Sequence, residues 1–416
     1  MKTRRPLALG MILALSTPSL VSAQLAPPAP VSLATGFAPA VQAKPLSNQV
    51  ERGLAFLVAH QGADGGWGQG EESSNMGGSM GHLAEASNVA DTCIALLSIM
   101  RAGSSGKSGR HTASILRGLD FVMGKIERSD ADSLTVTDVN GTRVQGKLGP
   151  HIDTFLSSML LAEAKGQMPH ADAESRLDRA LIKVVHKIER NQRADGTFEN
   201  QGWAPVLAQA VAGKGMNRAA QKGSKVSEAS RKKFEDYAQA QHDGASQSFG
   251  GEGSAGVALY AAAASVGTLS ESANTRGVEK EAAAEIMKAS PAPASAVAAR
   301  ETMEAADKLQ LASDAAQSTL VKNLDNAAFV SGFGSNGGEE FLSYMLVSES
   351  LITKGGKDWK DWDTSMTNNL NRVQNADGSF SGHHCITGRT FVTGAALLVL
   401  TADRAPMPLA SKIRRG

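Results

Sequence analysis

The sequence is poor in cysteine, in aromatic residues and in net charge. Its 416 residues contain only two cysteines, Cys93 and Cys385, and only 5% Phe, Trp and Tyr. With 42 basic residues against 41 acidic ones, no global field would hold the protein on a nucleic acid or an anionic membrane, and a nucleic-acid partner is excluded. The scarcity of aromatic residues predicts cores of Ala, Leu and Val, and 43 glycines predict many helix ends and tight turns.

The apolar stretch at the N-terminus is too short to span a membrane. It runs from Leu7 to Leu15, follows a basic start, and precedes Val21-Ser22-Ala23, the small-x-small pattern of a signal peptidase site. Position 24 is Gln, not the Cys that a bacterial lipid anchor needs. We therefore expect a signal peptide over residues 1–23 and an exported protein, periplasmic or secreted, that begins at Gln24.

Three further segments are distinguished by composition. Residues 24–46 hold five prolines with many alanines, which is typical of a flexible linker. Residues 47–404 carry the periodic pattern of a folded domain, and residues 405–416 form a tail. An Ala-rich and Glu-rich stretch over 268–320, broken at Pro291 and Pro293, predicts an inserted helical hairpin that could cover one rim of the domain.

Self-similarity is the strongest signal in the folded part. An amphipathic segment that opens at Arg52-Gly53 and ends in Asp64-Gly65-Gly66-Trp67 shares its opening with Arg117-Gly118. Its ending, Gln-x-x-Asp-Gly-x-aromatic, recurs at 192–198 and 374–380. A Gln before the turn can bond backbone groups, Asp-Gly suits a tight turn, and the aromatic residue can plug the gap to a neighbouring helix.

A second type of helix, rich in Ala, Leu and Gly, follows each turn. Residues 153–164 align with 339–350, and segments beginning near 89 and 388 fit the same frame. Their near-continuous apolar character predicts helices buried on most faces. We count six such pairs, with inner helices starting near residues 89, 151, 202, 254, 339 and 388, which predicts an all-α, two-layer ring.

The repeat resembles that of squalene and oxidosqualene cyclases and of protein prenyltransferase beta subunits. Residues 52–67 match its fixed positions, the other copies match in part, and the resemblance covers residues 47–402. It implies an (α/α)6 toroid of the terpenoid cyclase and prenyltransferase type, whose inner helices point their N-terminal ends at a central cavity. The Asp-x-Asp-Asp and Asp-Asp-x-x-Asp motifs of two terpene-processing classes are absent, so the reaction is not implied.

Four charged residues align near the N-terminal ends of inner helices, namely Asp91, Asp153, Glu339 and Arg389. Acids in a first turn complement the helix dipole, which is one explanation for them. Their convergence on one cavity supports a second, in which Asp153, Glu339 and Arg389 handle protons and charge during catalysis.

A metal site is suggested by the two cysteines. Asp91-Thr-Cys93 resembles the Asp-x-Cys pair that holds zinc in prenyltransferase beta subunits, and ring closure would bring His384 and Cys385 towards it. Asp, Cys and His are ligand types that zinc prefers. A disulfide between Cys93 and Cys385, common in exported proteins, and no role for either cysteine are alternatives that the sequence leaves open.

Three more residues lie at the predicted rim, namely His151, Trp203 and Glu340, and we expect them to contact a ligand. His151 stands two residues ahead of the position that holds the third zinc ligand in the resembled family, and Asp153 occupies that position. Two functions remain: a toroid whose cavity binds an apolar small molecule or a protein partner, and a zinc-dependent enzyme acting on an isoprenoid or other apolar substrate.

Overall fold

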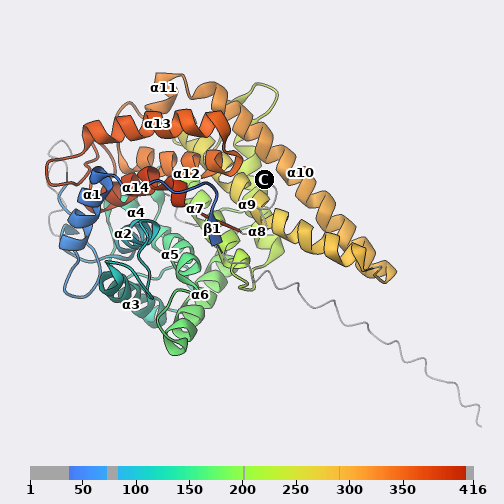
Figure 1. The fold of residues 1–416 in the computed structure, drawn as a ribbon, viewed down its shortest axis with the longest axis horizontal. Helices are drawn as coiled ribbons and strands as arrows, with labels where there is room; N and C mark the ends of the chain where they lie inside the picture. The colour runs from blue at the N-terminus through green and yellow to red at the C-terminus, as the bar shows by residue number, and fades with distance from the viewer. Residues whose placement is uncertain (1–36, 73–82, 200–201, 290, 409–416) are drawn as a thin grey trace, which may run out of the picture. The chain divides into compact units, whose positions relative to one another are not determined.

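The regular secondary structure of the described residues is almost all α-helical. The computed structural model describes residues 37–72, 83–199, 202–289 and 291–408 (Figure 1), and in these ranges extended structure is confined to two two-stranded ribbons and one isolated bridge. The predicted all-α class is confirmed. The expected signal peptide and most of the expected linker and tail lie outside the described residues.

Six inner helices form the ring. They are α2 (Val89–Arg101), α5 (Ile152–Ala164), α7 (Pro205–Gln221), α9 (Ala258–Lys288), α12 (Gly338–Lys354) and α14 (Arg389–Leu400). Each packs on the next, and α14 packs on α2, which closes the circle. The largest difference from a predicted start is four residues, at Ala258 against 254.

Six outer helices surround the ring, and each precedes its inner partner in the chain. They are α1 (Asn48–Ala59), α3 (Thr112–Arg128), α6 (Ala171–Asn191), α8 (Glu228–Ala240), α10 (Pro293–Asn323) and α13 (Gly356–Val373). The repeated Arg-Gly opening serves close approach between the layers. A Cβ at Gly53 would lie 2.7 Å from Leu397 of α14, and one at Gly118 would lie 2.7 Å from Leu96 of α2.

The Asp-Gly turns that follow α1, α6 and α13 each pack against the outer helix of the next pair. Gly65 has φ +88°, and a Cβ there would lie 2.5 Å from the carbonyl oxygen of Arg117, at the start of the following outer helix. The amide of Gln61 donates to Gly65 O (2.8 Å) and to Ser114 O (2.9 Å). Trp67 is fully buried and donates from Nε1 to Leu57 O at 2.7 Å. The repeated residues therefore perform the structural roles that the sequence predicted for them.

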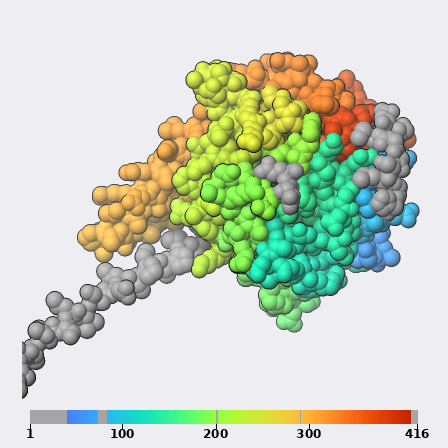
Figure 2. Space-filling view, turned by 180° about the vertical axis from the view of Figure 1, so that it is seen from behind, coloured from blue at the N-terminus to red at the C-terminus, as the bar shows by residue number. Residues whose placement is uncertain are grey.

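The expected hairpin insertion is a continuation of the ring helices. No boundary falls near residue 268, because α9 runs unbroken from the inner ring to Lys288, and Gly267 packs tightly on Leu346 of α12 inside it. The chain breaks at Pro291 and Pro293, as predicted, and returns as α10, the outer helix of the fifth pair. Figure 2 shows the far halves of the two helices, in yellow and orange, projecting from the body of the ring.

Short elements complete the structure. These are α4 (Arg143–Leu148), α11 (Ala327–Val330), a 3-10 turn (Ala402–Arg404), β2 (His242–Asp243) and β3 (Ser248–Phe249), which pair with each other, and β1 (Phe37–Pro39) and β4 (Pro406–Pro408). β1 and β4 run antiparallel, with Phe37 opposite Pro408. Part of the expected linker and part of the expected tail are thus a paired ribbon. Within the described ranges, the helices lack the combination of length and apolar character that a membrane span requires.

Buried charges fill the axis of the ring towards the C-terminal ends of the inner helices. Three cations (Arg101, Lys214, Arg218) and three acids (Glu163, Glu271, Glu349) come from five inner helices and are at most 6% exposed in their side chains. Because their formal charges cancel, this level of the ring is closed by ion pairs. The predicted site residues Asp91, Asp153, Glu339 and Arg389 lie at the opposite end, where the inner helices begin.

Candidate functional site

The first turns of α2 and α5 hold a buried pair of acids. Asp153 accepts hydrogen bonds from the backbone N of Ala90 (3.1 Å) and from Gln145 Nε2 (2.9 Å), while Asp91 accepts one from Asn88 Nδ2 (2.8 Å). Burial raises the pKa of Asp91 to about 7 and that of Asp153 to about 6, against the lowering effect of these bonds. Asp153 therefore caps α2 from α5, and the pKa of each acid is raised above its ordinary value.

Cys93 and Arg389 contact residues other than the predicted metal ligands. The buried Cys93 thiol lies 3.7 Å from Ser157 Oγ of α5, and both cysteines are free, so the alternative of a disulfide is not observed. Arg389 pairs with Asp377 (2.8 Å) and Glu71 (3.1 Å) on its outward side. Both ion pairs engage the guanidinium of Arg389, so the structure does not support its expected role as a cavity cation.

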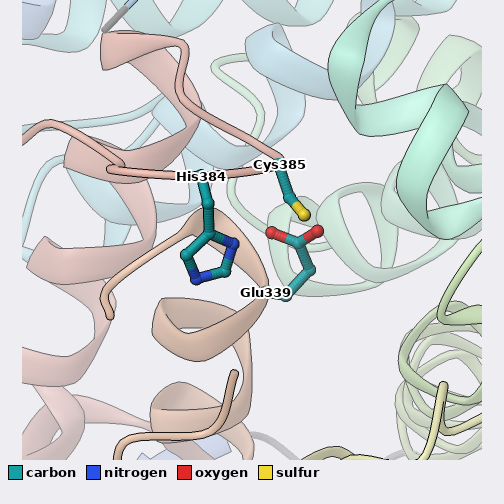
Figure 3. Close-up of side chains that lie close together, drawn as sticks. All are labelled: Glu339, His384 and Cys385. Atoms are coloured by element: carbon teal, nitrogen blue, oxygen red, sulfur yellow. The ribbon is translucent and has the colours of Figure 1, made fainter. Parts of the chain in front are cut away.

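Three predicted residues do converge at the start of α12. Glu339, His384 and Cys385 each offer a ligand atom within 4.8 Å of the others. In Figure 3 the Cys385 thiol and the Glu339 carboxylate face each other, and the His384 ring lies beside them. In the described part of the chain no other group of His, Cys, Asp and Glu side chains meets this criterion, and Asp91 and Cys93 are not members.

Backbone pairing builds this cluster. The segment before α12 and the loop before α14 are joined by bonds from His383 N to Asn336 O (2.7 Å) and from Gly338 N to Ile386 O (2.9 Å). A Cβ at Gly337 would lie 2.7 Å from His384 O, so glycine is needed for this approach. Cys385 has φ +55°, a backbone conformation that is unfavourable for residues other than glycine. This conformation turns its thiol towards the Glu339 carboxylate.

The orientation of His384 leaves one ring nitrogen available. Nε2 lies 2.6 Å from Ser335 O and 3.3 Å from Glu340 Oε2, and because a carbonyl oxygen can only accept, Nε2 carries the hydrogen. Nδ1 is buried and has no hydrogen-bond partner among the described residues. The neighbouring Cys385 thiol and the Glu340 carboxylate raise the pKa of His384 to about 10. Nδ1 is therefore the ring nitrogen that could serve as a ligand.

Glu339 completes the cluster from the first turn of α12. Its side chain is fully buried; Oε2 accepts from Ile386 N at 3.3 Å, and Oε1 has no partner within the described ranges. Burial raises the pKa of Glu339 to about 7. The cluster thus presents a thiol, an imidazole nitrogen and a carboxylate oxygen with unused bonding capacity.

Aromatic rings line the approach to the cluster. The ring of Phe333, 56% exposed, lies 5.3 Å from the His384 ring and 5.3 Å from that of Trp203, which in turn lies 6.2 Å from that of Tyr260. Lys147 places its ammonium 5.3 Å from the Trp203 ring. A surface pocket of about 380 Å³ adjoins Phe333 and has a lining of small and apolar residues: Ala255, Gly256, Val257, Ala258, Leu259, Ala328, Phe329, Gly332, Phe333 and Gly334.

His151 lines a different pocket from that of Phe333. It lines a small cavity of about 20 Å³ together with Phe155, Phe198 and Gln209. Burial lowers the pKa of His151, and its Nδ1 has no partner among the described residues. A cavity of this size has room for about one water molecule. Among the described residues, the pocket at His151 is therefore too small for a ligand larger than a water molecule.

Comparison with known proteins supports the fold. No family model and no curated protein matches the sequence. An inactive variant of an alpha-1,6-mannanase from a Salegentibacter species, solved with alpha-1,6-mannotriose, is similar in structure with a TM-score of 0.54 and 8% identity, over 86% of this chain and 99% of that one. A variant of a type II terpene cyclase from Scytonema, solved with its product merosterolic acid A, has a TM-score of 0.49 and 12% identity, over 86% and 96%. The ring of helix pairs makes the chain an α/α toroid, and the likeness to the mannanase concerns the fold alone.

Proposed function

We propose that this toroid is a metal-binding protein with a zinc site of the open, catalytic type at Glu339, His384 and Cys385. Zinc in catalytic sites takes three protein ligands drawn from Cys, His and carboxylates and keeps a fourth position for water or substrate. The convergence of these three ligand types within 4.8 Å is the observation that carries the proposal. It replaces the set predicted from the sequence, in which Asp91 and Cys93 joined His384 and Cys385.

The residues fit a cation in their bonding as well as their chemistry. Two buried atoms, His384 Nδ1 and Glu339 Oε1, have no partner among the described residues, although buried polar atoms are usually satisfied. A divalent cation would take both, in competition with a proton on the imidazole. Bound zinc would act as a Lewis acid and generate hydroxide at neutral pH. Glu339 would be held in place by Ile386 N, and Cys385 by its left-handed backbone.

An apolar small molecule is the ligand that the surroundings favour. The exposed Phe333 ring stands between the His384 ring and the pocket of about 380 Å³, whose lining contains no charged side chain. An apolar group in that pocket would leave a polar end of the same molecule free to reach the cluster. Export of the protein remains part of this proposal, and it would place the site outside the cytoplasm.

Elemental analysis of the full chain, purified without chelators, tests the metal. We expect about one zinc ion per chain, as in other three-ligand sites. His384→Ala and Cys385→Ala should lose it, whereas His383→Ala and Cys93→Ala, the neighbouring histidine and the second thiol, should keep it. Loss in Cys93→Ala would favour the set predicted from the sequence. An unaltered protein that stays free of metal after dialysis against zinc would refute the proposal.

A further inference from the structure

Glu340 occupies the centre of a hydrogen-bond arrangement beside the cluster. Its carboxylate is fully buried, and both of its oxygens are used. Oε2 accepts from Gly337 N at 2.9 Å and lies 3.3 Å from His384 Nε2. Oε1 accepts from Phe333 N at 3.0 Å and from the hydroxyl of Tyr260. The sequence predicted that Glu340 contacts a ligand, but these bonds direct it at other protein groups.

We infer that Glu340 is a positioning residue of the proposed metal site, that it presents His384 to the cation, and that Tyr260 holds it in place. This inference rests on the proposed function. A histidine that binds a metal through one ring nitrogen commonly donates from the other to a carboxylate or a carbonyl group, which sets the tautomer and raises the basicity of the ligand. His384 has both kinds of acceptor at Nε2, in Glu340 and Ser335 O.

A purely structural role explains only part of this arrangement. Capping of α12 requires one bond, from Gly337 N to Oε2. A neutral side chain could accept that bond without placing a carboxylate in a site where it is fully buried, and such burial is costly unless the charge is paired. In the described part of the chain, the ion pair made by Glu340 is with His384. The charge of Glu340 is therefore directed at the imidazole.

Glu340 Oε1 connects the proposed metal site to the aromatic residues Tyr260 and Phe333. Tyr260 comes from the first turn of α9, and Phe333 from the connection between α11 and α12, so Oε1 joins two elements that flank the cluster. Gly332, at φ +60°, has no room for a Cβ, which would lie 2.6 Å from Oε1. Displacement of Glu340 would therefore shift both Phe333 and the His384 ring.

The experiment measures Co²⁺ binding to the full chain by absorption, with Zn²⁺ competition for affinity. Glu340→Gln should weaken binding about 10- to 100-fold, the usual effect of losing such a partner, and should alter the visible Co²⁺ bands because the imidazole is no longer held. Tyr260→Phe should weaken binding about fivefold through the loss of one hydrogen bond. Tyr237→Phe, which removes a hydroxyl bonded to Glu252 O on α8's side of the ring, should change neither measurement.

The outcomes distinguish a failure of the positioning role of Glu340 from a failure of the proposed metal site. Binding and spectra in Glu340→Gln and Tyr260→Phe that match the unaltered protein, together with loss of Co²⁺ in His384→Ala, would overturn the positioning role and leave the metal site standing. An unaltered protein that binds no Co²⁺ would overturn both. If Glu340→Gln does not fold, as judged by circular dichroism, Tyr260→Phe decides the matter, because it leaves the buried carboxylate in place.

Discussion

The ion network on the ring axis predicts a large effect for one conservative substitution. Glu349 lies 2.7 Å from Arg101 Nη1, 2.8 Å from Lys214 Nζ and 2.7 Å from Arg218 Nη2, and its side chain is 2% exposed. Glu349→Gln preserves the size of the side chain but removes its charge. Three buried cations would then face two acids, Glu163 and Glu271.

Removing one partner from a buried ion pair typically costs about 3–5 kcal/mol, because it leaves a charge without compensation. Here each cation keeps another acid nearby, since Lys214 and Arg218 pair with Glu271 and Arg101 pairs with Glu163. We therefore expect the free energy of unfolding to fall by about 3 kcal/mol, the lower end of that range.

The effect should depend on pH with a definite sign. Burial alone would raise the pKa of Glu349, but Lys214, Arg101 and Arg218 outweigh it and hold that pKa well below its ordinary value of 4.5. A carboxyl group with a lowered pKa contributes its full stability above the pKa of the unfolded chain and loses it as the pH falls. The difference between the unaltered protein and Glu349→Gln should therefore be constant at neutral pH and shrink below about pH 4.5.

Urea unfolding followed by far-ultraviolet circular dichroism measures this difference. Asp361→Asn is the matched control, because Asp361 is 61% exposed in its pair with Lys357 and should change stability by less than about 0.5 kcal/mol. A loss in Glu349→Gln no larger than that of the control would refute the reasoning, since the axis charges would then be solvated rather than buried and paired.

Two further predictions concern the repeat turn and the acid pair. Gly65→Ala should destabilise the protein by about 2 kcal/mol or more in urea unfolding, whereas Gly103→Ala, equally left-handed at φ +103° but with open space around it, should lose only about 1 kcal/mol; equal losses would show that the contact with Arg117 O is unimportant. Because burial raises the pKa of Asp91 to about 7 from an ordinary 3.8, the stability of the unaltered protein should fall as the pH rises between these values, and Asp91→Asn should show a flatter pH profile; parallel profiles would contradict this assignment.

The ring was predictable because its signals are local and repeated. Gln, Asp-Gly and an aromatic residue recur at a fixed spacing, and each has a role within one turn and the helix that follows it, as Gln61 and Gly65 show. The hairpin was harder to delimit. Charged residues begin at Glu271 within α9, and this change in composition predicted an insertion. It marks the part of the helix that becomes more exposed, and the helix itself continues without a break.

The site was predictable only in part. His384, Cys385 and Glu339 were all singled out, but their grouping depends on the left-handed backbone of Cys385 and on Gly337, which the sequence does not reveal. Asp91 is bonded to Asn88 and Cys93 lies against Ser157, contacts with other inner-ring residues that the motif alone does not reveal. Tyr260 and Phe333 went unnoticed because they lie where the repeat is most degenerate.

The pairing of β1 with β4 gives the ring a second kind of closure. Its helices already form a circle, because α14 packs on α2, and the antiparallel ribbon sets Phe37 directly opposite Pro408. A short peptide that links these positions would make the backbone circular. The chain could then be opened elsewhere, at a repeat turn such as Asp377-Gly378. In the circular chain no helix pair would be first or last. In the reopened chain the helix pairs would be synthesised in a new order, so the order of synthesis could be separated from the order of assembly.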